Sequence, residues 1–250
     1  MINVSGKIAL ITGGSRGIGA SVSKVLAKAG ASISLTYVSD KSSAERCAAE
    51  IRDFGQTCLV TKAAVSESMD VKKVVENTLR KFGRIDILVN NAGVWKRGEI
   101  GRMTERQWDE TMDINLKGTF FFCNVVSPIM KKQRWGRIIN VSSTAGQRGE
   151  AFYSHYAASK AGMIAFTKSI AVELSPHNIN VNCIAPGWVD TDMTAEALRG
   201  TARKEIERSI PCGKVATPND IAGAALFLAS DLANHIVGAT INVNGGGVLM

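Results

Sequence analysis

Short apolar runs alternate with longer amphipathic segments along the whole chain. The runs are bounded by glycine, asparagine or aspartate, which is typical of buried strands. We expect strands at residues 7–12, 32–37, 57–63, 85–90, 137–141, 179–184 and 240–243. Between them, apolar residues recur at intervals of three and four positions, and several of these segments stop at a glycine, as helices do. We expect helices at 18–29, 42–54, 68–82, 105 to about 131 and 154–174, with another starting at Thr217.

Continuous apolar strands that alternate with helices are typical of a parallel sheet covered on both faces. We therefore predict an α/β fold, a doubly wound Rossmann-type sheet of about seven strands in a single domain over residues 1–250. No linker, low-complexity tract or short repeat interrupts the alternation. Residues 190–213 follow neither pattern, and we expect them to form a mobile loop at the substrate site.

Composition narrows the class of protein without changing this picture. Hydrophobic residues make up 45% of the chain and charged residues 21%, which is typical of a globular protein. No apolar run is long enough to span a bilayer, and we see no signal peptide, so we expect a cytoplasmic protein. The five cysteines form no CxxC pair, which argues against a disulfide framework and a zinc site, and we expect no metal. The net charge of +8 is spread along the chain, so we expect an anionic ligand rather than nucleic acid.

The turn between the first strand and the first helix is rich in glycine. Its sequence over residues 12–19 is TGGSRGIG, with the glycine spacing G-x3-G-x-G. Glycines there let the backbone approach a pyrophosphate, which then accepts hydrogen bonds from N–H groups at the helix start. Such a turn can also serve packing alone, but its place in the first strand–helix–strand unit favours dinucleotide binding. The residues that we expect to contact the dinucleotide are Gly13, Ser15, Arg16, Gly17, Ile18 and Gly19.

The residues after the second strand favour NADP(H) over NAD. An NAD site needs a carboxylate at the end of that strand to hold the ribose 2′-hydroxyl, but the strand ends at Tyr37. Arg16 in the glycine turn, with Ser39 and Lys41 near the strand end, suits a 2′-phosphate. The alternative is that Asp40 turns back to the ribose and that the basic residues are only surface charges.

Tyr156 and Lys160 are four residues apart in the predicted helix at 154–174, so they share one face of it. An ammonium about 4 Å from a phenol, at an effective dielectric constant of about 20, favours the phenolate by about 4 kcal/mol. We therefore expect Lys160 to lower the pKa of Tyr156 toward neutrality, where a phenol can exchange protons with a carbonyl or alcohol oxygen. Alone, such a pair is common on helix surfaces, and the motifs around it decide its meaning.

Further motifs flank this pair in a fixed order: NNAG at 90–93, an asparagine at 115, VSS at 141–143 and PGWVDT at 186–191. Together they resemble the classical short-chain dehydrogenase/reductases over essentially the whole chain. The resemblance implies the strand order 3-2-1-4-5-6-7 and a catalytic tetrad. In it, Tyr156 is the acid/base, Ser143 hydrogen-bonds the substrate oxygen, and Lys160 tunes Tyr156 and holds the nicotinamide ribose. Asn115 holds a water that links Lys160 to solvent.

The same resemblance implies the remaining contacts to NADP(H). It places Tyr37, Ser39, Ala64, Val65, Asn91, Ala92, Gly93, Tyr156, Lys160, Pro186, Gly187, Val189 and Thr191 in the cofactor cleft, beside the glycine turn. Val189 and Thr191 would position the nicotinamide carboxamide. Many relatives carry an acid before the valine where this chain has Ala64, so we expect only a backbone contact to adenine there.

Within the family, residues 137–143, 180–193 and 237–246 are most similar to 3-oxoacyl-[acyl-carrier-protein] reductases. The resemblance implies NADPH-dependent reduction of a 3-oxoacyl thioester. A dehydrogenase of another small alcohol, ketone or sugar is the alternative, and a non-catalytic dinucleotide sensor is disfavoured by the complete tetrad. The expected substrate contacts are Ser143, Ala145, Tyr153, Tyr156, Trp188 and Met193, with Trp95 nearby. The tryptophans favour an acyl chain or a ring.

The resemblance also implies partners. A carrier protein would dock on two arginines beside the cleft, and here Arg134 matches one position while His177 replaces the other. We expect a homotetramer, built through the helices at 105–131 and 154–174 and the C-terminal segment.

Overall fold

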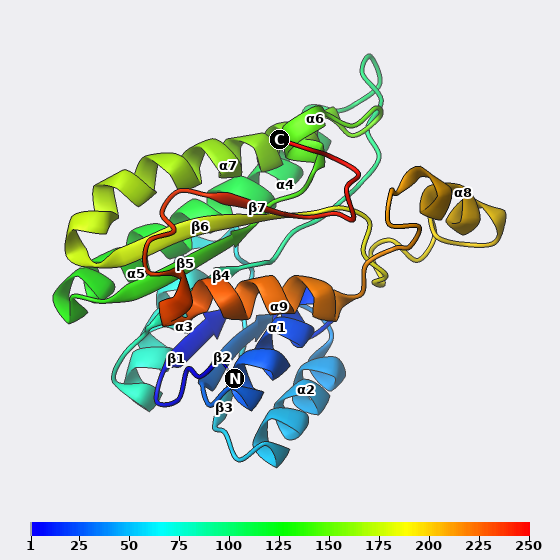
Figure 1. Cartoon of the computed structure of the whole chain (residues 1–250). Coiled ribbons are helices and arrows are strands. Elements are labelled where there is room, and N and C mark those ends of the chain that lie inside the picture. The colour runs from blue at the N-terminus through cyan, green and yellow to red at the C-terminus, as the bar shows by residue number, and fades with distance from the viewer. Residues whose placement is uncertain (1) are drawn as a thin grey trace.

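Seven parallel strands form one sheet at the centre of the protein (Figure 1). The computed structural model describes residues 2–250. The strands are β1 (Ile8–Ile11), β2 (Ser32–Tyr37), β3 (Cys58–Lys62), β4 (Ile87–Asn90), β5 (Gly136–Val141), β6 (Ile179–Pro186) and β7 (Thr240–Val243). They lie side by side in the order β3-β2-β1-β4-β5-β6-β7, and all neighbours are parallel. The predicted doubly wound sheet and its strand order are confirmed.

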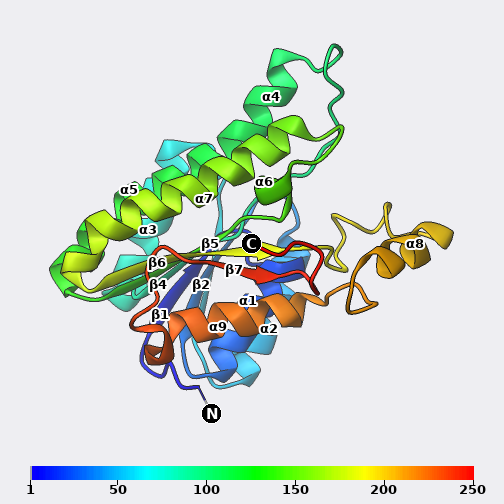
Figure 2. The ribbon, with the colours of Figure 1, turned by 45° about the horizontal axis from the view of Figure 1, so that its top comes forward.

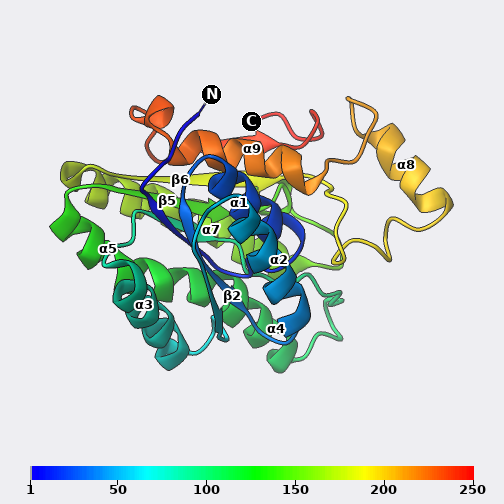
Figure 3. The ribbon, with the colours of Figure 1, turned by 90° about the horizontal axis from the view of Figure 1, so that it is seen from below.

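Helices accompany the strands, and most of them pack on one or the other face of the sheet. They are α1 (Gly17–Lys28), α2 (Lys41–Asp53), α3 (Ser68–Phe82), α4 (Glu105–Met112), α5 (Gly118–Gln133), α6 (Ala145–Arg148), α7 (Ser154–Leu174), α8 (Thr201–Ser209) and α9 (Pro218–Ala229). Successive strand residues point to opposite faces. Ala9 and Ile11 therefore pack with α1, α2 and α9, whereas Leu10 packs with α3, α5 and α7. Figures 2 and 3 show these two layers on either side of the strands. Within residues 2–250, no helix has the length and hydropathy that a membrane span requires.

Two segments differ from the sequence-based expectation. The single helix expected at 105–131 is divided into α4, a π-helical segment (Asp113–Lys117) and α5. Residues 190–213, expected to be irregular, contain α8, which stands away from the sheet (Figure 1). Arg203 of α8 donates a hydrogen bond to Asp190 at 2.8 Å, and this contact joins the helix to the start of its own segment. The mobility expected for this segment stays a prediction.

The loops that carry the predicted motifs meet at one edge of the sheet. In parallel strands all carboxyl ends lie at the same edge, which is where ligands bind in folds of this type. The register places Asn90 beside Asn140 and Val141 beside Ile184, so the loops after β4, β5 and β6 start at neighbouring positions. The glycine turn follows the adjacent strand β1.

Candidate active site

The glycine turn after β1 is shaped by close backbone contacts. Gly13 and Gly17 have φ angles of 60° and 53°, a region in which side chains are strained. A Cβ atom on Gly19 would lie 2.2 Å from the carbonyl oxygen of Gly13, so only glycine fits where α1 begins. The first N–H groups of α1 have no partner within the helix, and they suit a pyrophosphate.

The loop after β4 is joined to the glycine turn. The backbone N–H groups of Asn91 and Ala92 both donate to Thr12 Oγ1 at 3.0 Å. In return, Asn91 Nδ2 donates to the carbonyl oxygens of Thr12 at 3.0 Å and of Gly13 at 3.1 Å. The predicted cofactor residues of the two loops therefore form one hydrogen-bonded unit.

The region after β2 bears on the alternative that Asp40 turns back to the ribose. Asp40 is the N-cap of α2, and its carboxylate accepts hydrogen bonds from the backbone N–H of Ser43 at 2.9 Å and from the Ser43 hydroxyl at 2.5 Å. These hydrogen bonds hold the pKa of Asp40 below its usual value. Its carboxylate is thus engaged in capping, while Ser39 and Lys41 are exposed beside it. Arg16 is also exposed, and its guanidinium lies 4.0 Å from the carboxylate of Asp192.

The loop after β3 offers less backbone than expected. The N–H of Ala64 donates to the carboxylate of Asp70 at 2.9 Å, and its carbonyl oxygen accepts from Glu67 at 3.1 Å. Val65 is buried and lies against Gly118, where a Cβ atom would be 2.9 Å from its side chain. The Ala64 N–H is therefore already engaged, and a backbone contact from this residue to adenine would use the second lone pair of its carbonyl oxygen.

The π-helical segment carries Asn115 into the interior. Asn115 is fully buried, and its amide exchanges two hydrogen bonds with the backbone of Val94, at 2.8 and 3.0 Å. Its Nδ2 also donates to Ser159 Oγ at 3.1 Å, one residue before Lys160. The extra residue of a π-turn places this side chain between the loop after β4 and α7.

Three members of the predicted tetrad meet where β5 ends and α7 begins. Lys160 is buried, and its Nζ donates to the carbonyl oxygen of Val141 at 2.8 Å. Ser143 lies two residues after the end of β5, and its side chain is close enough to Tyr156 to lower the pKa of that phenol. Lys160 Nζ lies 5.8 Å from the centre of the Tyr156 ring. The structure thus brings Ser143, Tyr156 and Lys160 together, and Asn115 contacts the same helix through Ser159.

Burial shifts both titratable members of this cluster. Desolvation raises the pKa of the half-buried Tyr156 to about 12, and the nearby hydroxyl of Ser143 lowers it by less. Desolvation also lowers the pKa of Lys160 to about 8. The expected fall of the Tyr156 pKa toward neutrality is wrong for this structure, because desolvation of the phenol prevails over the ammonium of Lys160, which is directed at Val141. At neutral pH the pair is therefore phenol and ammonium.

The segment after β6 is fixed by its own backbone. Gly187 N–H donates to Val243 at 3.1 Å, and Val189 forms an isolated bridge with Ala216. Thr191 lies against Gly17 of the glycine turn, where a Cβ atom would be 3.4 Å from its methyl group. Pro186, at the end of β6, accepts a hydrogen bond from Thr144 at 2.9 Å. The predicted cofactor residues of this segment are therefore placed beside both the glycine turn and β5.

Aromatic side chains from three loops form a cluster at the start of α7, the helix that carries Tyr156. Trp95 stacks on Tyr153 with ring centres 4.5 Å apart and an interplanar angle of 9°. Trp188 meets Trp95 edge-on, with ring centres 5.8 Å apart. Of the other predicted substrate residues, Ala145 is buried and donates to Ser143 Oγ at 3.1 Å. Met193 is 48% exposed on its loop. The cluster therefore joins Trp95 to Tyr153 and Trp188, two of the predicted substrate residues.

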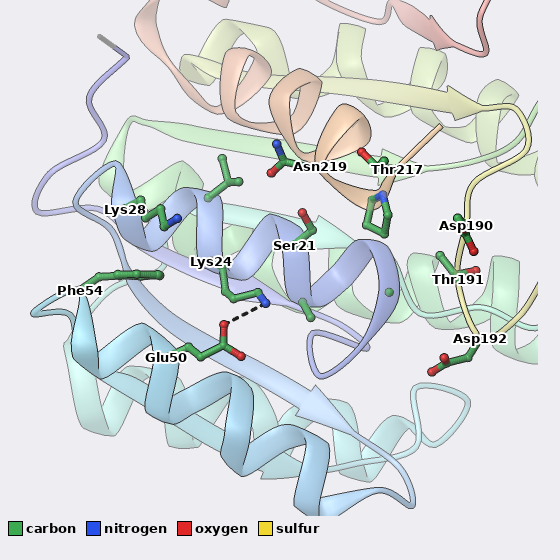
Figure 4. Close-up of a pocket in the computed structure, with 14 residues that line it drawn as sticks. Ser21, Lys24, Lys28, Glu50, Phe54, Asp190, Thr191, Asp192, Thr217 and Asn219 are labelled. Carbon is green, nitrogen blue, oxygen red and sulfur yellow. Dashed lines mark hydrogen bonds and ion pairs between the residues drawn. The ribbon is translucent and has the colours of Figure 1, made fainter. Parts of the chain in front are cut away.

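A pocket of about 540 Å³ lies on the outer side of α1, between α2, α9 and the start of the 190–213 segment (Figure 4). Gly17 and Thr191 line it, but none of the predicted catalytic residues does. The ion pair between Lys24 and Glu50, 3.0 Å long, crosses it from α1 to α2. It is therefore separate from the cluster around Tyr156.

The two expected carrier-docking residues lie near the C-terminal end of α7, whereas Tyr156 lies near its N-terminal end. Arg134 follows α5, and its carbonyl oxygen accepts a hydrogen bond from Asn178, the neighbour of His177. His177 comes 21 positions after Tyr156, and α7 fills most of this interval. At about 1.5 Å per helical residue, Tyr156 and His177 are about 30 Å apart. The expectation that these residues flank the cleft is wrong within one chain, because α7 separates them from Tyr156.

Sequence reasoning missed two residues of the site. Ser159 accepts the hydrogen bond from Asn115 and donates to the carbonyl oxygen of Tyr156 at 2.7 Å. Its position inside the Tyr156–Lys160 motif was the available signal. Glu150 is partly buried, and desolvation raises its pKa while the nearby indole of Trp95 lowers it by less. Nothing in its sequence context indicated that contact.

Comparisons with known proteins agree with this geometry. A family model described as "Enoyl-(Acyl carrier protein) reductase" matches residues 13–247. The 3-oxoacyl-[acyl-carrier-protein] reductase FabG of Staphylococcus aureus is 41% identical over 240 residues, 96% of this chain and 97% of the relative. The chain belongs to the short-chain dehydrogenase/reductase family. The 3-oxoacyl-[acyl-carrier-protein] reductase of Synechocystis is 40% identical over 250 residues and the full length of both chains.

Solved structures of short-chain dehydrogenases have the same fold. The crystal structure of levodione reductase superposes with a TM-score of 0.93 at 32% identity, covering 97% of each chain. A putative short-chain alcohol dehydrogenase from Sinorhizobium meliloti superposes with a TM-score of 0.94 at 34% identity, covering 98% of this chain and 97% of the other. Family membership makes the protein an oxidoreductase that uses a nicotinamide dinucleotide and acts on CH–OH or C=O groups.

Proposed function

We propose that the protein is an NADPH-dependent reductase of 3-oxoacyl thioesters, including those on acyl carrier protein, and acts in the cytoplasm. The observation that carries the reductase assignment is the meeting of Ser143, Tyr156 and Lys160 where β5 ends and α7 begins. The relatives named for this activity, 40 and 41% identical over nearly the whole chain, support the substrate class.

The mechanism follows from the protonation states of the site. Ser143 and Tyr156 donate hydrogen bonds to the carbonyl oxygen, where negative charge develops. Because burial raises the pKa of Tyr156 to about 12, its phenol holds the proton that this oxygen must receive. Lys160, charged below about pH 8, stabilises the phenolate that remains. NADPH held at the glycine turn would supply a hydride for the carbonyl carbon, and with the proton from Tyr156 the product would be the 3-hydroxyacyl thioester.

The residues around the glycine turn fit this cofactor. Gly13, Gly17 and Gly19 bring backbone N–H groups close to a pyrophosphate, with no Cβ atom in the way. Arg16 is exposed and close enough to Asp40 to lower the pKa of that carboxylate, so its positive charge is available where a 2′-phosphate would need it, near the exposed Ser39 and Lys41 that flank Asp40 in sequence. Lys160 would hold the nicotinamide ribose.

A substrate panel tests the proposed function. Purified protein is given NADPH with acetoacetyl-CoA, crotonyl-CoA, a cyclic diketone or a simple aldose, and NADPH absorbance is followed. We expect the highest kcat/KM with acetoacetyl-CoA. Turnover of crotonyl-CoA alone would contradict the proposal and favour the carbon–carbon double-bond reduction named by the family model.

The aromatic cluster supports a second candidate, a compact cyclic ketone. Trp95 and Tyr153 are stacked in contact, and Trp188 meets Trp95 edge-on, so flat apolar surfaces lie at the start of the helix that carries Tyr156. The structural neighbour named levodione reductase is consistent with this shape of substrate. In the panel, a cyclic diketone with a higher kcat/KM than acetoacetyl-CoA would favour this candidate. Trp95→Ala should then lower kcat/KM for the diketone more than for acetoacetyl-CoA.

Cofactor preference gives a further prediction. Arg16→Ala should lower kcat/KM for NADPH by about 10- to 100-fold, because a charge-assisted contact to the 2′-phosphate is lost, and barely change it for NADH. Arg52→Ala is the matched control, because Arg52 lies in the last turn of α2, at the opposite end of that helix from Lys41. Equal kcat/KM values with NADPH and NADH in the wild-type protein would refute the assignment of NADP(H).

We propose that the protein is a homotetramer. An apolar groove of about 400 Å³ runs between the π-helical segment, α5 and α7, lined by Leu116, Phe120 and Phe166, and Phe120 is 42% exposed. Covering this groove with a second copy would bury it. Light scattering should give a mass near four times 26.7 kDa, and Phe120→Asp should give a smaller species that still folds. A monomeric wild-type mass would show that the groove has another role.

A further inference from the structure

Three buried polar side chains cross the apolar layer between the sheet and α7. Asn90 of β4, Asn140 of β5 and Thr167 of α7, which we call the polar ladder, are each at most 3% exposed. They lie among the apolar side chains that pack α3, α5 and α7 on this face. A buried amide is costly unless it is paired, so each of these residues needs its partner.

Most of the partners are members of the ladder, although Asn90 Nδ2 also donates to Cys123 Sγ at 3.3 Å and Asn90 Oδ1 has no partner among the described residues. Asn90 Nδ2 donates to Asn140 Oδ1 at 2.9 Å, and the two residues are register partners in neighbouring strands. Asn140 Nδ2 donates to Thr167 Oγ1 at 2.8 Å, and Thr167 in turn donates to the carbonyl oxygen of Met163 at 2.8 Å. The ladder therefore connects two strands to one turn of α7.

The ladder fixes a degree of freedom that apolar packing leaves open. Apolar contacts are non-directional, so they tolerate a small slide of a helix along a sheet. Hydrogen bonds depend on distance and direction. A slide of α7 by the rise of one residue, about 1.5 Å, would break the hydrogen bond between Asn140 and Thr167. The ladder thus selects one axial position of α7 against β5.

That axial position also aligns the candidate active site. Tyr156, Lys160, Met163 and Thr167 lie on one face of α7, and Asn140 directly precedes the residues that contact Lys160. The carbonyl oxygen of Val141 accepts from Lys160 Nζ, and the hydroxyl of Ser142 donates to the Lys160 carbonyl oxygen, both at 2.8 Å. Three consecutive residues of the β5 end therefore bond to α7, and Ser143 follows them.

We propose that Asn140 and Thr167 are positioning residues of the active site, which hold α7 where Lys160 meets Val141 and Tyr156 meets Ser143. Neither residue touches the substrate or the cofactor, and both act through α7. The kinetic part of this proposal rests on the proposed reductase function, whereas the structural part does not.

Thr167→Val tests the proposal, because it keeps the shape of the side chain and removes the acceptor for Asn140. With acetoacetyl-CoA and NADPH, we expect kcat to fall by about tenfold or more, since displacements of about 1 Å cost up to about a hundredfold. KM for acetoacetyl-CoA should change far less than kcat, because alignment rather than binding is lost. Thr167→Ser, which keeps the hydroxyl, should restore kcat to within about twofold.

Thr78→Val is the matched control. Thr78 is fully buried in α3, bonds to the carbonyl oxygen of Val74 at 2.8 Å, and pairs with the Ser34 hydroxyl of β2 at 2.8 Å. It therefore joins a helix to a strand as Thr167 does, but away from α7. We expect Thr78→Val and Thr167→Val to lower the urea midpoint alike, and only Thr167→Val to lower kcat. Equal effects on kcat would overturn the proposal.

A measurement without turnover separates this proposal from the proposed function. The NMR signal of lysine isotope-labelled at Cε, assigned with Lys160→Met, reports the pKa of Lys160. The titratable groups facing it are Tyr156 on α7 and the Cys183 thiol on β6, whose pKa values burial raises to about 12 and about 11. Both are neutral below about pH 9.

In Thr167→Val, a shifted α7 should expose Lys160 to water, and its pKa should rise from about 8 toward the ordinary value of 10.5. In Thr78→Val it should not move. If the wild-type protein turns over no acetoacetyl-CoA, the proposed function fails. The Lys160 titration still tests whether the ladder positions α7. An unchanged Lys160 pKa in Thr167→Val would overturn the positioning role. Should that variant not fold, Thr167→Cys, with a weaker acceptor, replaces it in both measurements.

Discussion

Tyr156→Phe should lower kcat for carbonyl reduction by at least about a hundredfold, the low end for a well-placed general acid. The substitution keeps the ring and removes the proton that the substrate oxygen must receive. Cofactor binding should remain nearly intact, because the ring keeps its place in α7. Steady-state kinetics with acetoacetyl-CoA, together with NADPH binding followed by fluorescence, would measure both effects.

Tyr153→Phe is the natural comparison for this variant. Tyr153 lies three residues earlier and stacks on Trp95, but residue 157 is alanine, so no lysine follows it at the fourth position. We expect a far smaller loss of kcat than for Tyr156→Phe. Near-normal turnover by Tyr156→Phe would remove the main support for the proposed mechanism.

Lys160→Met should remove activity and, at pH 7, make the protein more stable. The fall of the Lys160 pKa from 10.5 to about 8 corresponds to about 3 kcal/mol spent on keeping a buried ammonium. Loss of the donor leaves the Val141 carbonyl oxygen unpaired, which costs about 1–2 kcal/mol. We expect a net gain of about 1–2 kcal/mol in the free energy of unfolding, measured by urea denaturation.

The gain should depend on pH in a defined direction. Between about pH 8 and 10.5 the unfolded lysine binds a proton that the folded one does not, so Lys160 destabilises the fold less as pH rises. The advantage of Lys160→Met should therefore be largest below pH 8 and disappear toward pH 10.5. Lys24→Met, at a partly exposed lysine paired with Glu50, should show no such trend. A Lys160→Met variant less stable than wild type at pH 7 would contradict the buried-charge argument.

The same titration should appear in catalysis. In the reduction direction, kcat should fall as pH rises through about 8, because neutral Lys160 no longer stabilises the phenolate of Tyr156. A pH profile of kcat with acetoacetyl-CoA checks this expectation, and a flat profile from pH 7 to 9 would speak against it.

The fold could be predicted from the sequence because its signals are local and repeated. Each buried strand is a continuous apolar run, and most helix ends carry a local mark, such as Gly83 after α3 or Thr217 before α9. The residues that meet around Tyr156 were also within reach, since carboxyl ends of parallel strands share one edge.

Other features depend on distances that no local pattern contains. The pKa of Tyr156 depends on whether burial or the nearby ammonium prevails, and Lys160 is directed at Val141 instead. The place of Arg134 and His177 depends on the length of α7 between them and Tyr156. The contact between Trp95 and Glu150 joins two loops of irregular sequence. Each needed three-dimensional coordinates.

The π-helical segment at Asp113–Lys117 bears on how this chain could change over evolution. A π-turn corresponds to one residue inserted into an α-helix, and each residue of a helix turns the following side chains by about 100°. Deleting one residue there would let α4 and α5 join in an unbroken helix while rotating Asn115 away from Val94 and Ser159. The fold would tolerate such a deletion and the site would not, so a gap at this point in a relative's sequence would mark a protein that keeps the architecture and has lost the chemistry.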